Sequence, residues 1–301
     1  MPLALALATT VAAVPSSFLA CSSDSQTAAP DAVDAGARAE AGTDDAAGSS
    51  DAPSGGGDSG NVGRVFAVSD STTVDGGVRA THRAGAFFAR LTGPATTTKA
   101  KTVGPCLVET IGSGDEPTET ALSAGTVRIT GGSKAINIVP ASDKTYEPVS
   151  GATPLWSGGE TLEVSAQGQD VPAFATSLVA PSKLTVTAPA LPAAAGSLAV
   201  TRSAPFTATW AGVSTGSVVL YFEAATGSNA FTATCTFPAA DTTASVPAAA
   251  FAEFPAGEGT FDFYVRQSAP AATDGWSILF TASRALVGPD GMGATGYATF
   301  K

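Results

Sequence analysis

Two glycine-framed segments carry residues that could do chemistry. Gly212–Gly216 (GVSTG) has the G-x-S-x-G spacing of a nucleophile elbow, in which a strand, a sharp turn and a helix present a serine to a histidine base. Here a strand-like apolar segment, Ser217–Glu223, comes after the motif, and the one histidine of the chain, His82, precedes it. The pattern therefore predicts a hairpin turn and not a hydrolase elbow.

The second segment, Gly291–Gly296 (GMGATG), has the G-x-G-x-x-G spacing of a dinucleotide-binding turn. That turn has to open a helix within a strand–helix–strand unit. Only five residues follow Gly296, and they alternate as a strand does. We expect a loop before the last strand and no nucleotide or other cofactor.

Metal chemistry lacks a converging set of ligands in the sequence. A zinc site needs about three or four ligands, mostly His or Cys. His82 and the cysteines Cys106 and Cys235 are scattered along the chain, and His82 lies between basic residues ahead of a strand. We expect no metal site and a surface position for His82.

Acid–base chemistry has one cluster, the loop that holds Asp115, Glu116 and Glu119. Glycoside hydrolysis requires paired carboxylates, whereas adjacent acids in a Gly/Pro-rich loop are typical of a solvated turn. A cell-surface hydrolase acting on glycans or peptides is the alternative function. It predicts a concave site that joins at least two acids of the following set: Asp115, Glu116, Glu119, Asp143, Glu147, Glu160 and Glu163.

Two tryptophans could stack on the apolar face of a sugar. Trp276 begins a strand-like segment, and Trp156 precedes Ser157-Gly158-Gly159, which predicts an exposed loop edge. Core packing is the usual role of tryptophan in a β domain. Trp156 is therefore the candidate ligand-binding residue, with burial in a core as the alternative.

Short strands are the elements that must position these residues. Apolar and polar residues alternate with period two, bounded by Gly, Pro and Asp clusters. The pattern predicts strands at Phe206–Trp210, Phe231–Phe237, Phe261–Arg266, Trp276–Thr281, Arg64–Val68, Ala86–Leu91, Thr126–Thr130, Thr161–Ser165, Lys183–Thr187, Ser197–Thr201 and Ser217–Glu223. One polar face per strand and this density of strands predict an all-β fold of antiparallel sandwiches or barrels.

A proline-rich run at 188–195 suggests a domain boundary. We expect a β domain over residues 63–190 and a β-sandwich domain over residues 197–301, the second of immunoglobulin-like size. A single larger two-sheet domain is the alternative. Cys106 and Cys235 could pair in an oxidising compartment, or remain free thiols that pack as small hydrophobic residues.

The segment Ser22–Val62 differs sharply in composition from the chain after it. It contains no aromatic residue and no Leu, Ile or Met, and it holds eight acidic residues against Arg38 alone, so that it carries most of the chain's net charge of −11. Such a segment cannot bury enough apolar surface to offset the entropy of ordering it. We expect residues 21–62 to form a disordered acidic linker, extended by self-repulsion.

The first twenty residues are uncharged and hold an apolar run, Leu3–Val14, of signal-peptide length. Apolar residues and then Ala20 precede Cys21, and this arrangement resembles the lipobox of bacterial lipoproteins. The resemblance implies that residues 1–20 are a signal peptide and that Cys21 receives a diacylglyceryl group and becomes the acylated N-terminus, with chains such as palmitate. Ser22 after the cysteine implies sorting to the outer membrane.

The expected function rests on the anchor, the linker, the β domains and the lack of a catalytic set. We expect a non-catalytic cell-envelope module that binds a protein or a polysaccharide or serves a structural role. Its anchor makes the membrane a partner. Nucleic acid is not an expected partner, because the chain is acidic and has no basic stripe interleaved with aromatic residues.

Overall fold

The structure is a computed structural model that describes residues 60–74, 77–93, 98–112, 117–192, 196–289, 291 and 293–301. The expected signal peptide over 1–20, the lipidation residue Cys21 and nearly all of the expected linker over 21–62 lie outside the described residues. The exception is 60–62, where the first strand already begins at Asn61. Backbone alone is described at residues 70–81 where strands are assigned.

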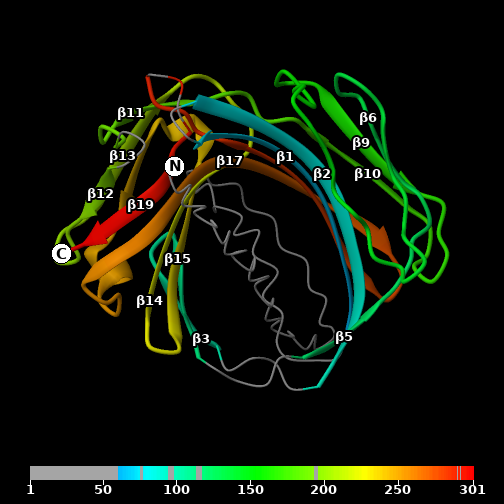
Figure 1. The fold of residues 1–301 in the computed structure, drawn as a ribbon, viewed down its shortest axis with the longest axis horizontal. Helices are drawn as coiled ribbons and strands as arrows, with labels where there is room; N and C mark the ends of the chain where they lie inside the picture. Colours follow the sequence, from blue (N-terminus) through cyan, green and yellow to red (C-terminus); the bar gives the residue numbers. More distant parts are fainter. Residues whose placement is uncertain are drawn as a thin grey trace, which may run out of the picture.

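The expected all-β class is confirmed, and the largest element is a 12-stranded sheet (Figure 1). Across this sheet the strands run β3 (Thr98–Val103), β4 (Cys106–Ile111), β15 (Asn229–Pro238), β14 (Ser217–Thr226), β17 (Gly257–Thr273), β18 (Trp276–Ala285), β1 (Asn61–Val74), β2 (Gly77–Thr92) and β5 (Thr118–Ala121). In addition, β19 (Thr295–Phe300) pairs with β17 and with β12 (Ser197–Val200), and β8 (Val149–Gly151) pairs with β2.

Two small sheets complete the described fold. One has the order β10 (Phe174–Val179), β9 (Thr161–Ala166), β6 (Val127–Thr130) and β7 (Ile136–Ile138), and the other has the order β11 (Thr185–Ala188), β13 (Phe206–Ala211) and β16 (Thr243–Val246). The helical segments are two short 3₁₀ turns, η1 (Ala239–Asp241) and η2 (Ala248–Phe251). Nowhere in the described ranges is there a helix with the length and apolar character to cross a membrane.

Most strand pairs are antiparallel, as the alternation predicts, but two pairs are parallel. The strand β1 pairs in parallel with β18 over Asn61 to Ser69, and β12 pairs in parallel with β19. A parallel pair needs a long connection between its strands, and here more than half of the chain separates β1 from β18. By contrast, β17 and β18 are joined by a tight turn in which Gly275 has φ +70°, a conformation that glycine adopts without steric cost.

Both hydrophobic cores lie on one face of the long sheet. The 17-residue strand β17 shows this directly, because its odd-numbered residues face the cores along its whole length: Phe261, Phe263 and Val265 belong to one core and Ala271 to the other. The three-stranded sheet covers the first core and the four-stranded sheet covers the second. In Figure 1 the long sheet arches with these small sheets on its outer side. We call the opposite face of the long sheet the inner face.

Each core draws on residues from both sides of the expected boundary near residues 188–195. The core under the three-stranded sheet includes Cys106 and Val108 with residues of 197–301, and the core under the four-stranded sheet includes Ile278 and Phe280 with residues of 63–190. The long sheet likewise interleaves strands from both segments. The expected domains 63–190 and 197–301 therefore do not correspond to separate cores, because strand pairing joins distant segments that composition alone separates.

Candidate functional site

Both glycine-framed motifs lie in loops, but the predicted hairpin at Gly212–Gly216 is wrong, because the strands on its two sides, β13 and β14, belong to different sheets. Ser214 sits in the turn between β13 and β14, where its hydroxyl accepts a hydrogen bond from the Ser182 amide at 2.9 Å and donates one to the Thr215 carbonyl at 3.1 Å. A strand, and not a helix, comes after it. The described part of Gly291–Gly296 leads into the strand β19. Neither motif has the helix that its chemistry needs.

His82 is buried at 5% exposure, so its predicted surface position is wrong. It lies on β2 beside Ser69 of β1, and the Ser69 hydroxyl is 2.9 Å from His82 Nδ1. Burial, and then the charge of Arg284, lower the pKa of His82. The reason for the burial is that His82 shares the core-facing side of β2 with Ala84 and Phe88, which the short predicted strand at Ala86–Leu91 did not reach.

Trp156 is fully buried, which corrects the expectation of an exposed loop edge. Its indole Nε1 donates to the Pro181 carbonyl at 3.0 Å, and the Arg284 guanidinium lies 5.5 Å from its ring centre. Arg284 also donates to the Trp156 carbonyl at 2.6 Å. These contacts fix the ring in the core under the four-stranded sheet, so it presents no face on which a sugar could stack.

Most described acids of the hydrolase alternative are exposed (Glu119, Asp143, Glu147 and Glu163), and Glu160 is half-buried. Asp143 accepts hydrogen bonds from the amide and hydroxyl of Thr145 in its own turn, and Glu160 accepts from the amides of Ser157 and Gly158. Glu163 lies on the exposed side of β9. Asp115 and Glu116 lie outside the described residues. Within the described ranges no group of three or more His, Cys, Asp or Glu residues could hold a metal ion.

Cys106 and Cys235 form a disulfide, which resolves the alternative left open by the sequence. They are directly opposite each other on β4 and β15, and both are fully buried. The bridge joins residues 129 positions apart in the sequence. It therefore links the two segments that the composition had suggested as separate domains.

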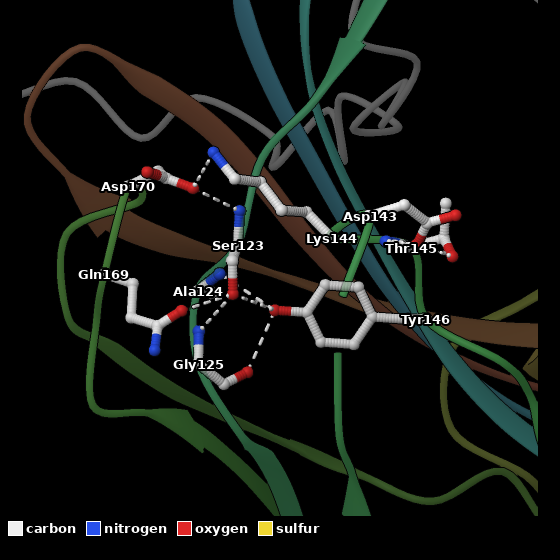
Figure 2. Close-up of polar contacts among 9 residues, drawn as sticks. All are labelled: Ser123, Ala124, Gly125, Asp143, Lys144, Thr145, Tyr146, Gln169 and Asp170. Atoms are coloured by element: carbon white, nitrogen blue, oxygen red, sulfur yellow. Dashed lines mark hydrogen bonds and ion pairs between the residues drawn. The ribbon is translucent and has the colours of Figure 1, made fainter. Parts of the chain in front are cut away.

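A polar network around Tyr146 is the most extensive one that the structure describes (Figure 2). The Tyr146 hydroxyl accepts from the Ala124 amide at 2.8 Å and donates to the Gly125 carbonyl at 2.9 Å. The Ser123 hydroxyl donates to Gln169 Oε1 at 2.6 Å. Because each hydroxyl is hydrogen-bonded to a neighbour within the fold, we interpret this network as a structural link between loops and not as a reactive site.

Asp170 is also part of this link between loops. It accepts from the Ser123 amide at 2.9 Å and lies 3.0 Å from the Lys144 ammonium group. The Ser123 amide and then Lys144 lower the pKa of Asp170. A carboxylate held ionised by such partners stabilises the loop arrangement near neutral pH.

The inner face of the long sheet carries a row of polar residues across three neighbouring strands. Glu109 of β4, Thr232 of β15 and Glu223 of β14 are register partners in one row across three neighbouring strands, with Thr232 in the middle. Their chain neighbours, such as Val108 and Phe222, point to the core. The row therefore lies on the inner face, beside Tyr221, which is two residues from Glu223 on β14.

Burial in this row is unusual for polar side chains. Glu109 is 9% exposed and Thr232 is 2% exposed. The Thr232 hydroxyl has no hydrogen-bond partner, and no hydrogen bond or ion pair among the described residues involves the Glu109 carboxylate. Buried polar groups are hydrogen-bonded in the great majority of cases. The unpaired Thr232 hydroxyl, with the Glu109 carboxylate beside it, is therefore the clearest candidate binding site in the described structure.

Both glutamates of the row influence the pKa of the neighbouring Tyr221. Burial raises the pKa of Glu109. The Tyr221 hydroxyl donates to Glu223 Oε2 at 2.8 Å, and burial, followed by the charge of Glu223 and a smaller contribution from Glu109, raises the pKa of Tyr221. Tyr221 therefore stays protonated and acts as a donor that orients the Glu223 carboxylate.

The two halves of the inner face differ in charge. The half formed by β4, β15 and β14 holds Glu109 and Glu223, whereas β1, β2 and the later part of β17 contribute Arg64, Arg83 and Arg266. Aromatic rings accompany the arginines: Phe66 lies directly over Gly85, where a Cβ atom would come within 2.4 Å of the ring, and Phe87 is 37% exposed.

Sequence reasoning did not single out Glu109, Thr232 or Glu223. A signal was present, since Glu109 alternates with Val108 and Glu223 comes after the core residue Phe222 in strand-like segments. The row forms only because β15 lies between β4 and β14. That order of strands cannot be derived from local alternation.

The fold and this row define an all-β protein in which one arched sheet bears two cores on one face and a charged row on the other. No protein-family model matches the chain, and a search of the curated proteins gave no significant match.

Proposed function

We propose that this protein is a non-catalytic binding module of the bacterial cell envelope, anchored to the outer membrane through lipidated Cys21. In this proposal residues 21–62 are an acidic tether and the inner face of the long sheet binds a protein or polysaccharide ligand. The anchor rests on the lipobox resemblance around Cys21 and on the composition of Ser22–Val62. Three acyl chains would exceed the two signals that stable membrane anchoring requires.

One observation carries the binding role. The Thr232 hydroxyl is a buried polar group on the inner face with no hydrogen-bond partner in the described structure, and its neighbour Glu109 is only 9% exposed. Leaving a buried polar group unpaired costs about 1–3 kcal/mol. A ligand that pairs with these groups would remove this cost on binding. In a sheet with a purely structural role, apolar residues at the same positions would give the fold greater stability.

The anchor is tested by growing the expressing bacterium with radiolabelled palmitate. We expect label in the wild-type protein and none in the Cys21→Ala variant, which should accumulate with its leader uncut. A mature N-terminus at any residue other than Cys21 contradicts the anchor.

The binding role is tested by presenting the full-length protein in detergent micelles to arrays of glycans and peptides. We expect specific binding that the inner-face variant Glu223→Gln weakens and that Glu163→Gln, on the outer surface of the four-stranded sheet, leaves unchanged. Hydrolysis of the arrayed ligands would instead support the hydrolase alternative, and binding that is insensitive to Glu223→Gln would move the site away from the inner face.

A further inference from the structure

We propose that Glu109, Thr232 and Glu223 bind a primary ammonium group, supplied by a lysine side chain of a protein ligand. This inference rests on the proposed binding role of the inner face and names the chemistry of its ligand. The three residues stand in one row on β4, β15 and β14, with the threonine between the two carboxylates.

The spacing of the row suits a small cation. Neighbouring strands lie about 4.8 Å apart, so the backbones of Glu109 and Glu223 are separated by roughly 10 Å. Each glutamate side chain is long enough to lean toward the middle of this span, on the side of the sheet that carries Thr232. A single polyatomic cation above Thr232 can therefore contact all three side chains.

The hydrogen-bonding capacity of the row also fits. An ammonium group has three N–H donors and no acceptor. The row offers three acceptors: the Glu109 carboxylate, the Thr232 hydroxyl oxygen and the Glu223 carboxylate. Tyr221 already donates to one oxygen of Glu223 at 2.8 Å, which orients that carboxylate and leaves its other oxygen for the ligand.

Burial favours a charged ligand over a neutral one. A buried carboxylate is costly unless it is paired with a cation, and the described residues supply no such partner to Glu109, which is 9% exposed. The nearby lysines of β3, Lys99 and Lys101, are register partners of residues on the opposite face of the sheet. The counter-charge for Glu109 would therefore come from a ligand.

A metal ion fits the row less well. Calcium takes about six to eight oxygen ligands, whereas the row has two carboxylates and one threonine. No described group of three or more His, Cys, Asp or Glu residues reaches metal-binding proximity. The three acceptors of the row match the three N–H donors of an ammonium group better than the larger oxygen shell of a hard cation.

Isothermal titration of the full-length protein in detergent micelles tests this inference. The probes are a capped hexalysine peptide, the same peptide with every lysine acetylated, a capped hexaarginine peptide, spermidine and CaCl₂. We expect hexalysine to bind and the acetylated peptide to bind at least about tenfold more weakly, since charge-assisted hydrogen bonds are about twice as strong as neutral ones. Spermidine binding as tightly as hexalysine would identify a small amine, and not a protein, as the ligand and overturn the assignment of its source.

Matched variants separate the row from the acidic tether, which is the same in every protein compared. Glu109→Gln and Glu223→Gln should each weaken hexalysine binding at least about tenfold, and Glu163→Gln, an equal loss of charge on the outer surface, by less than about twofold. Thr232→Val leaves the charge unchanged and should weaken binding about fivefold or more, whereas Thr236→Val on the same strand and face should not. Circular dichroism confirms the fold of each variant.

Four results would overturn the inference. Equal losses with Glu109→Gln and Glu163→Gln would assign the binding to diffuse negative charge. Equal binding of hexaarginine and of hexalysine would exclude a site built for ammonium. Tight CaCl₂ binding that depends on Glu109 and Glu223 would identify a metal site. Row-dependent binding of a neutral glycan without binding of hexalysine would refute this inference while leaving the proposed binding role intact.

Discussion

Replacing Thr232 by valine should raise the free energy of unfolding. The two side chains have nearly the same shape, but valine lacks the hydroxyl, and this hydroxyl is buried with no partner in a residue that is 2% exposed. A buried unpaired hydroxyl costs about 1–3 kcal/mol, and its removal should return that amount. For a folded region of this size about 1 kcal/mol corresponds to about 2–4 °C in Tm, so we expect a rise of about 2–12 °C.

Thermal and urea unfolding of the full-length protein in detergent measure this effect. Thr236→Val is the control, because Thr236 lies on the same strand and face but is only half-buried; we expect it to change the free energy of unfolding by about 0.5 kcal/mol or less. Saturating hexalysine should narrow the gap between wild type and Thr232→Val, since the ligand pairs with the hydroxyl in the wild type only. A loss of stability in Thr232→Val of about 1 kcal/mol or more would show that the hydroxyl has a partner and would refute the reasoning.

Three further predictions concern pH and the disulfide. Burial raises the pKa of Glu109, so the folded state holds its proton more tightly, and stability from this group should fall as pH rises from 4.5 through the raised folded pKa; Glu109→Gln should flatten this part of a Tm-against-pH curve. The pKa of His82 is lowered, so stability should fall as pH drops below 6.5, the unfolded value, and the loss should be smaller in His82→Gln. Removing the bridge between Cys106 and Cys235, 129 positions apart, should lower the free energy of unfolding in urea by about 5 kcal/mol in the chain-entropy model.

Each of these predictions has a distinct control. A Glu109→Gln protein that keeps the pH slope of the wild type between 4.5 and neutrality would assign the slope to another carboxyl group. For His82, a wild-type Tm that stays constant from pH 7 to pH 5 would show that the buried ring does not govern acid stability. For the disulfide, a reductant should destabilise the wild type and leave the Cys106→Ala/Cys235→Ala double variant unchanged; a wild type insensitive to reductant would contradict the prediction.

Many strands that face a core could be predicted from the sequence, although the core-facing strands β4, β7, β10 and β16 were missed, and strands without a buried face could not be predicted. Segments such as Phe231–Phe237 and Phe261–Arg266 alternate because one side packs into the core. The strands β3 (TKAKTV) and β5 (TETA) are largely exposed at the two ends of the long sheet. Without a buried face they carry no apolar alternation, and the backbone pairing that forms them leaves no pattern in the residues.

The candidate site could not be predicted for the same reason, because it depends on strand pairing that leaves no pattern in the sequence. Glu223 ends a predicted strand, and Thr232 lies beside it in the hairpin of β14 and β15, but Glu109 joins the row only through the pairing of β4 with β15 across more than a hundred residues. Trp156 was misplaced for a related reason. Its flanking glycines indicate a loop correctly, but the loop folds inward, and the indole ring of Trp156 packs into the core under the four-stranded sheet.

The parallel pairing of β1 with β18 sets an order of events during synthesis. The first strand within the described residues, at Asn61–Val74, pairs with a strand that is synthesised much later, at Trp276–Ala285. Contacts so distant in sequence form slowly, because a long loop has to close before they are gained. A nascent chain of this kind can complete its long sheet only when translation is nearly finished.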